Sequence, residues 1–184
     1  MDKKQCSESC PLKYADYKIS EGFGDFQKSI LFVAHRGDER VLENNLFWDN
    51  HEQALLETDS GKSLMEILDY CKLGLKDIRF TNIVKCLLPQ KEKIPEEAYT
   101  NCEINLREDI ESTKPKAIVA FGESCFKYMF PGDYKGNFLK EIGKIYSYYN
   151  KPVLITHHLS KIYRLQKPNE AEKIRKFLED WVFS

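Results

Sequence analysis

The chain has 184 residues, a length that suits one domain with a substantial core and excludes two domains of ordinary size. Hydrophobic residues make up 42% of it, but the longest apolar runs are too short to span a bilayer. The net charge of −1 excludes a protein that is basic as a whole, so any phosphate-binding surface must be local. Because the N-terminal residues lack the apolar stretch of a secretory signal, we expect a cytoplasmic protein with reduced thiols.

Four short apolar runs predict β-strands, and the segments between them have helical character. The strands are expected at residues 30–34, 79–84, 117–121 and 152–156. This alternation predicts an α/β fold, with three α/β/α layers around a mostly parallel four-stranded sheet. We expect residues 1–184 to form a single domain.

Helices are expected at residues 60–74, 95–115, 123–129 and 169–183. The first has a Ser60 N-cap and ends at Gly74, and the second starts at Pro95, which suits a first helical turn. The last helix should bury one apolar face, made of Ile174, Phe177, Leu178 and Trp181.

Ligands of parallel sheets bind beyond the carboxyl ends of the strands. Four loops are expected there, with the sequences HRGDER, KCLLPQ, GESC and HHLSKIYR. Three of them carry unusual polar chemistry, whereas GESC is also explained as a helix start. The binding or catalytic site is therefore expected where these loops meet.

Four of the six cysteines, Cys6, Cys10, Cys86 and Cys102, form two pairs that are far apart in the chain. Four thiolates can hold an iron-sulfur cluster or a structural zinc ion, but this spacing matches no compact zinc finger and also fits scattered buried thiols. Cys71 falls on the apolar face of a predicted helix and Cys125 in a short helix, so both are expected in the core.

Seven features occur in one order along the chain. They are a cysteine pair, an arm with Gly22 and Gly24, the strand ILFVA, and the segments SGKSLMEIL, FTNIVKC, PKAIVAFG and PVLITHHLSKIYR, with Cys102 following FTNIVKC. With this set, the chain resembles the family 4 uracil-DNA glycosylases, the iron-sulfur branch of their superfamily, over nearly its whole length.

The resemblance implies a 4Fe-4S cluster held by Cys6, Cys10, Cys86 and Cys102, with residues 1–28 as an arm tied to the core by the cluster. The interval from Cys86 to Cys102 matches the family. The first pair departs from it, because three residues separate Cys6 from Cys10 and the family usually has two.

The resemblance also implies how the base is recognised. Asn82 matches the Asn that reads uracil, because its amide offers a donor and an acceptor to O4 and N3–H, and cytosine presents the reverse. His158 matches the His that donates to uracil O2 as negative charge develops there. Leu159 replaces the usual Pro of this motif, and His157 is an additional imidazole that solvent alone could explain.

Further residues are expected along the DNA. Ser160, Lys161 and Arg164 follow His158 where the family contacts the phosphate backbone. The family places an aromatic ring over the flipped base, and counting from the first strand puts Trp48 there, beside Phe47. An apparent insertion, HEQALLETD, follows before the family pattern resumes at Ser60.

The segment AHRGDER departs from the family, which has a Gly-Glu pair where this chain has Ala34 and His35. Three interpretations remain open. Asp38 or Glu39 takes the place of the missing carboxylate, His35 orients water itself, or hydrolysis is weak or lost. A solvated charged turn would look the same.

The resemblance thus implies a monomeric DNA-repair glycosylase that hydrolyses the N-glycosidic bond of deoxyuridine, or of a related deaminated base, and leaves an abasic site. Its partner would be DNA that contains such a base. The alternative is an iron-sulfur DNA-binding or lesion-sensing protein of the same fold with little hydrolytic activity. A zinc protein unrelated to DNA is the remaining possibility.

Overall fold

The computed structural model describes residues 6–15, 19–20, 22–38, 58–89, 92–166 and 168–184. Its main elements in chain order are β1 (Phe23–Gly24), β2 (Ile30–Asp38), α3 (Asp59–Cys71), β3 (Arg79–Leu88), α4 (Glu96–Thr113), β4 (Ala117–Phe121), α5 (Glu123–Met129), β5 (Ile145–Tyr148), β6 (Lys151–Thr156), α6 (Leu159–Arg164) and α7 (Pro168–Trp181). Two short 3-10 turns, Leu75–Asp77 and Phe138–Lys140, complete them.

The strands form one sheet in the order β1-β3-β2-β4-β6-β5. The four inner strands β3, β2, β4 and β6 are parallel, as the sequence predicts, while β1 and β5 pair antiparallel at the two edges. The expected four-stranded sheet is therefore extended to six strands. Both additions lack a strong pattern, because β1 has two residues and β5 alternates between exposed and half-buried positions.

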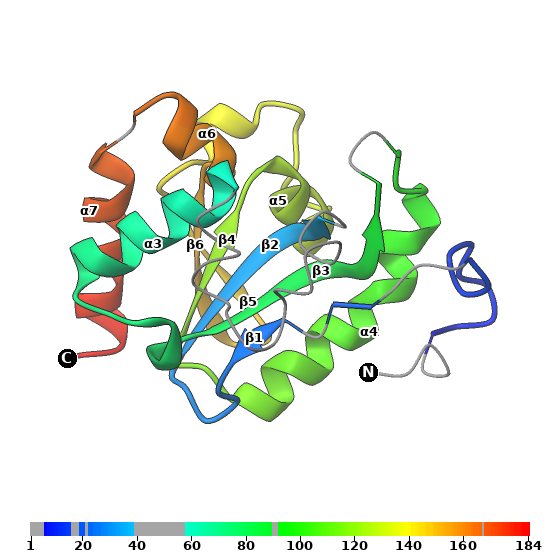
Figure 1. The fold of residues 1–184 in the computed structure, drawn as a ribbon, viewed down its shortest axis with the longest axis horizontal. Coiled ribbons are helices and arrows are strands. Elements are labelled where there is room, and N and C mark those ends of the chain that lie inside the picture. Colours follow the sequence, from blue (N-terminus) through cyan, green and yellow to red (C-terminus); the bar gives the residue numbers. More distant parts are fainter. Residues whose placement is uncertain (1–5, 16–18, 21, 39–57, 90–91, 167) are drawn as a thin grey trace.

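Helices cover both faces of the sheet (Figure 1), which confirms the three-layer architecture. On one face Leu31 and Val33 of β2 pack in a cluster with residues of α4 and α5. On the other face Phe32 packs with α3, α6 and α7, and meets Phe121 of β4 edge to face at 5.4 Å. Alternation of side chains along β2 thus supplies both cores from one strand.

Helix α3 follows the predicted apolar spacing, and Leu64, Ile67, Leu68 and Cys71 are all buried. Its ends were predicted wrongly. Thr58 is the N-cap in place of Ser60, since its hydroxyl accepts the Gly61 N–H at 3.0 Å. The helix ends at Cys71 before reaching Gly74, because Lys72 takes the left-handed conformation (φ 58°) and caps it.

The last helix was predicted with one wrong core residue. Ile174, Phe177 and Leu178 are buried as expected, but Trp181 is 47% exposed and Val182 packs inside in its place. The start of α4 at Pro95 and the bounds of α5 are confirmed. No described helix is long and apolar enough to cross a membrane.

Strands β2 and β3 continue beyond their predicted ends. Ala34 pairs with Asn82, and after an irregularity Asp38 pairs with Leu88, so HRGD and KCLL are strand and not loop. At this irregularity a Cβ on Gly37 would come within 2.1 Å of the Leu87 side chain. Cys86 therefore lies inside β3 and does not end it.

Candidate active site

The site lies where the chain reverses its direction across the sheet. From β2 the chain moves outward to β3, and then returns to the other side of β2 to form β4. Open parallel sheets bind ligands in the crevice beyond the carboxyl ends at such a reversal. In this chain the reversal brings together the ends of β2 and β4, between the neighbouring strands β3 and β6.

Asn82 lies in β3 beside Ala34 of β2, and its side chain is 4% exposed. Its Nδ2 donates to the Ser20 hydroxyl at 3.4 Å. Ser20 is held in turn by its own N–H, which bonds to the Lys85 carbonyl at 2.7 Å. The N-terminal arm thus runs beside Asn82 and restrains the rotation of its amide.

His158 is the N-cap of α6, a helix that was predicted as loop. Its Nδ1 accepts the Ser160 N–H at 3.2 Å and lies 2.8 Å from the Ser160 hydroxyl. A backbone N–H can only donate, so Nδ1 carries no proton and the neutral ring holds its proton on Nε2. Burial lowers the pKa of His158, and the charges of Lys161 and Arg164 lower it further.

Gly122 brings β4 close to His158. A Cβ at this position would lie 3.1 to 3.3 Å from three atoms of His158, and the backbone has a φ of 93° that favours glycine. Strand β4 therefore ends in a residue without a side chain where the imidazole packs. This contact fixes the His158 ring from the side of the sheet.

His35 follows Ala34 in the second half of β2, three residues before the strand ends. Its Nε2 lies 2.6 Å from the Tyr99 hydroxyl of α4, and the two rings stack at 5.6 Å. Burial lowers the pKa of His35 to about 4, and charge on Arg36 or His158 lowers it too. The site thus contains a second imidazole that is neutral at physiological pH.

Among the neighbours of these groups, His157 differs from expectation. His157 is 7% exposed and interacts electrostatically with Glu170, so it is a core residue and not a solvated loop histidine. Arg164 forms an ion pair with Asp59 at 2.7 Å, whereas Lys161 stays exposed. Ser160 is engaged with His158, so its hydroxyl positions the imidazole in this structure.

Of the remaining residues predicted for catalysis or base binding, Asp38 alone lies in the described part of the chain. Asp38 lies at the last position of β2, three residues beyond His35, and pairs in register with Leu88. Glu39, Phe47 and Trp48 lie outside the described residues, as does most of the segment HEQALLETD.

All four predicted cysteine ligands are among the described residues, and Cys102 is part of α4. Cys10 and Cys86 are buried in the same core cluster, Cys6 packs against that cluster, and Cys102 of α4 interacts electrostatically with Cys10. Within the described ranges no three His, Cys, Asp or Glu side chains are grouped as the ligands of one metal ion. Cys71 and Cys125 are core residues, as predicted.

Burial raises the pKa of the Cys102 thiol, but two hydrogen bonds to its sulfur favour the thiolate that a metal ligand needs. Its sulfur accepts the Lys85 N–H at 3.4 Å and the Asn105 amide at 3.5 Å. N–H groups that point at a sulfur stabilise negative charge on it. Ser9 of the arm also donates to Asn101 at 2.8 Å, which holds the cysteine-bearing arm against α4.

Sequence reasoning missed two polar groups that support the site. The first is Tyr99, which the sequence does not distinguish from any other residue of a helix. The second is a buried group in which Lys85 contacts Thr81 and Asp109, with Arg79 3.7 Å from the same carboxylate. The Lys of FTNIVKC, inside an apolar strand, was the available signal for the second group.

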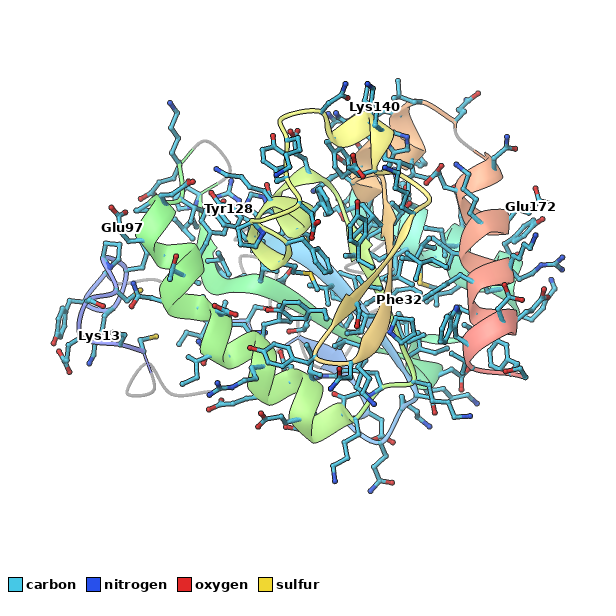
Figure 2. All side chains as sticks on the ribbon, turned by 180° about the vertical axis from the view of Figure 1, so that it is seen from behind. Lys13, Phe32, Glu97, Tyr128, Lys140 and Glu172 are labelled. Carbon is cyan, nitrogen blue, oxygen red and sulfur yellow. The ribbon has the colours of Figure 1, made fainter. Side chains whose placement is uncertain are left out.

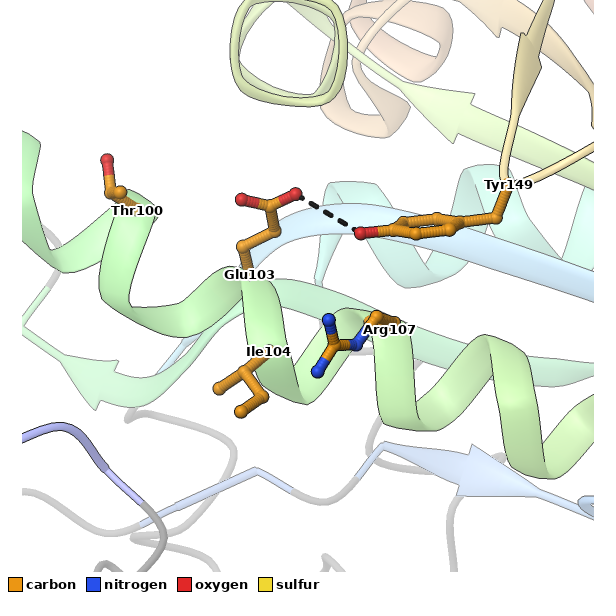
Figure 3. A pocket seen from close by; sticks show the side chains of 5 residues that line it. All are labelled: Thr100, Glu103, Ile104, Arg107 and Tyr149. Carbon is orange, nitrogen blue, oxygen red and sulfur yellow. Dashed lines mark hydrogen bonds between the residues drawn. The ribbon is translucent and has the colours of Figure 1, made fainter.

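A shallow pocket lies elsewhere, on the outer side of α4 (Figure 3). It is lined by Thr100, Glu103, Ile104, Arg107 and Tyr149. Tyr149 belongs to the β5–β6 turn, at the amino end of β6, and the other four lining residues belong to α4. None of the predicted site residues lines it.

The family model described as the uracil DNA glycosylase superfamily matches residues 21–182. A type-4 uracil-DNA glycosylase of Archaeoglobus fulgidus is 28% identical over 89% of this chain and 81% of its own length. A type-4 enzyme of Sulfurisphaera tokodaii is 31% identical over 66% of this chain. A type-5 enzyme of Pyrobaculum aerophilum is 40% identical over 57% of it.

The chain spans 56% of the Sulfurisphaera protein and 49% of the Pyrobaculum protein, so about half of each is matched. The resemblance to family 4 that the motifs predict is confirmed by the two type-4 relatives. The match to the family model covers well over half of the sequence. The chain therefore belongs to the uracil DNA glycosylase superfamily.

Proposed function

We propose that this protein removes uracil from DNA by hydrolysing the N-glycosidic bond of deoxyuridine, leaving an abasic site. The observation that carries the proposal is the neutral imidazole of His158, held with its proton on Nε2 beside the end of β4. Such a donor stabilises the negative charge that develops on uracil O2 as the base departs. A neutral donor is suited to this task because it does not give up its proton at physiological pH.

Asn82 is proposed to select the base. Its amide is buried and restrained by Ser20, so its donor and acceptor have a defined orientation. This orientation complements O4 and N3–H of a flipped uracil, and the reversed pattern of cytosine leaves both groups unpaired. Sites of this type reject the wrong partner strongly because buried polar groups lose their hydrogen bonds.

In the segment AHRGDER, we propose that His35, and not Asp38 or Glu39, occupies the active site. It comes directly after the residue that pairs with Asn82, and its pKa responds to the charge of His158, so the three side chains share one end of the sheet. Asp38 follows three residues later, paired with Leu88. Trp48 or Phe47 is proposed to stack on the base, as the family resemblance implies.

The DNA backbone is proposed to run past α6. Lys161 is exposed at its first turn, and Arg164 at its last turn can exchange Asp59 for a phosphate, because the present ion pair is solvent-exposed. We propose that the protein acts as a monomer in the cytoplasm on DNA that contains a deaminated base. Residues 1–184 would form one domain for this purpose.

The test is incubation with a DNA strand that carries a single uracil, followed by detection of alkali-labile breaks. Wild-type protein should give product, and Asn82→Ala and His158→Ala should give far less. A panel with hypoxanthine and xanthine in the same position separates uracil from other deaminated bases. DNA binding without product, unchanged in either variant, would contradict the proposal and indicate a lesion-sensing protein.

We also propose that Cys6, Cys10, Cys86 and Cys102 hold a 4Fe-4S cluster. The donor set is appropriate, since clusters of this type take four cysteine thiolates, and the two N–H groups directed at Cys102 favour its charged form. When bound, the cluster would supply a structural link between the arm and α4. Because the arm also carries Ser20, this link would hold the partner of Asn82 in place.

Anaerobically purified protein should therefore contain iron and show the broad visible absorption of an iron-sulfur cluster. Cys86→Ser should lower the unfolding temperature before it alters the choice of base. Zinc in place of iron would contradict the cluster, and so would cluster-free protein that is folded and fully active.

A further inference from the structure

Tyr99 contacts His35 through both its hydroxyl and its ring. The hydroxyl oxygen lies 2.6 Å from Nε2, and the two rings are parallel to within 7°. Tyr99 is in the first turns of α4, whereas His35 directly follows the apolar run of β2. The contact therefore joins the edge of the active site to a helix that carries a predicted cysteine ligand.

The Tyr99 ring also packs against a second tyrosine. Tyr128 of α5, labelled in Figure 2, stacks on the Tyr99 ring with 3.6 Å between the ring centroids and 7° between the ring planes. The rings of His35, Tyr99 and Tyr128 are therefore nearly parallel. The Tyr128 hydroxyl bonds to Glu96, which also pairs with Lys127. Tyr99 itself is 9% exposed. The phenol is thus fixed in position before any ligand binds.

The direction of the hydrogen bond follows from the chemistry of the two groups. Burial raises the pKa of Tyr99 to about 12 and lowers that of His35 to about 4, so both are neutral. A neutral phenol is a better donor than acceptor, and an imidazole nitrogen with a lone pair is a better acceptor than a phenol oxygen. Among the described residues His35 is the hydrogen-bond partner of the Tyr99 hydroxyl. The hydroxyl therefore donates to Nε2.

We infer that Tyr99 is a positioning residue for His35. By donating to Nε2 it fixes the tautomer of His35 that carries its proton on Nδ1, so that His35 acts as an N–H donor and not as a base that activates water. The inference rests on the proposed glycosylase activity. The site then presents two neutral imidazoles with opposite tautomers, His158 with its proton on Nε2 and His35 with its proton on Nδ1. Both stabilise negative charge, and neither removes a proton from water.

Hydrolysis without a base at this position is chemically balanced. The glycosidic bond breaks and its electron pair leaves with the base, and water adds its oxygen to the sugar carbon. The proton that this water loses reaches the departed base through solvent. An electrophilic, oxocarbenium-like sugar makes a strong base unnecessary for the attack.

The direct test is NMR of the unliganded protein with nitrogen-15 in its histidines. Nitrogen shifts distinguish the protonated from the unprotonated ring position, and the His35 signals are identified by their absence from His35→Gln. We expect Nδ1–H for His35 in wild type. An Nε2–H tautomer in wild type would overturn the inference. This readout needs no activity, so it stands even if the proposed function fails.

The kinetic test compares Tyr99→Phe with Tyr128→Phe. Tyr99→Phe keeps the stacked rings and removes only the donor to His35, whereas Tyr128→Phe removes a hydroxyl that bonds outward to Glu96. We expect a 10- to 100-fold lower single-turnover excision rate for Tyr99→Phe, with unchanged DNA affinity, and a change within about twofold for Tyr128→Phe. Equal rates for the two variants, with both folded, would overturn the inference.

Discussion

His35 of β2 and His158, which follows β6, are both neutral, but the two imidazoles are fixed by different means. His158 is held by its own helix, since its partner Ser160 is two residues away. His35 is held by Tyr99, which is 64 residues away on another helix. The comparison shows that a short motif can set the tautomer of one imidazole, whereas the tautomer of the other depends on a contact between distant segments.

The largest effect is expected from removing the locally fixed imidazole. His158→Ala should lower the single-turnover excision rate by about 100- to 1000-fold, because the departing base loses its donor. DNA affinity should change little, which a binding titration with uncleavable DNA would check. A rate loss that is larger in His35→Ala than in His158→Ala would reverse the assignment of the two roles.

A smaller loss is expected when the support of His158 is disturbed from the sheet. Gly122→Ala places a Cβ within 3.1 to 3.3 Å of His158 and strains a backbone with a φ of 93°. We expect about a 10- to 100-fold lower excision rate and a loss of about 1–2 kcal/mol in the free energy of unfolding. Gly132→Ala is the matched control, because a Cβ there meets no described atom within 4 Å. Similar rates in both variants would contradict the packing argument.

The depressed pKa of His35 makes stability depend on pH. In the unfolded chain this histidine takes up a proton as the pH falls below about 6.5, but in the folded protein it does so only near pH 4. Its contribution to stability is therefore present above pH 6.5 and lost between these values. We expect wild type to lose about 2 kcal/mol more than His35→Gln between pH 7 and pH 4.5 in urea unfolding, less than the full shift because the side chain is only half-buried. Equal losses would show that His35 is not protected from protonation.

The smallest effect is expected at Ser160. Ser160→Ala removes the hydroxyl near Nδ1 of His158 but keeps the backbone N–H that also bonds to it. We expect a three- to tenfold lower excision rate, equivalent to about 1 kcal/mol. A loss as large as that of His158→Ala would mean that the hydroxyl has a direct role on the substrate.

The parts of the fold that local sequence determines could be predicted. Four buried apolar runs separated by helices identified the parallel core, and the i, i+3, i+4 spacing in α3 identified its buried face. The ends of the helices and strands were predicted less well. Thr58 and Lys72 cap α3, although Ser60 and Gly74 were the residues expected to do so. Lys72 adopts a left-handed conformation, which is usually expected of glycine.

The same distinction applies to the site. Asn82 and His158 were proposed from the sequence because they lie in motifs that the family resemblance picks out, although the helix after His158 was predicted as loop. The Tyr99 contact could not be predicted, because it depends on how α4 crosses the end of β2 and no pattern in either segment encodes that distance. His157 illustrates the converse, since a histidine in a polar segment proved to be buried near Glu170.

Single-turnover excision of uracil as a function of pH tests the central claim most directly. Both imidazoles have pKa values below the usual 6.5, and both act as neutral donors in this account. The account predicts that uracil is excised and that the rate is constant from pH 6.5 upward. The absence of product, or a rate that rises steeply with pH through the neutral range as a general base would require, would contradict it.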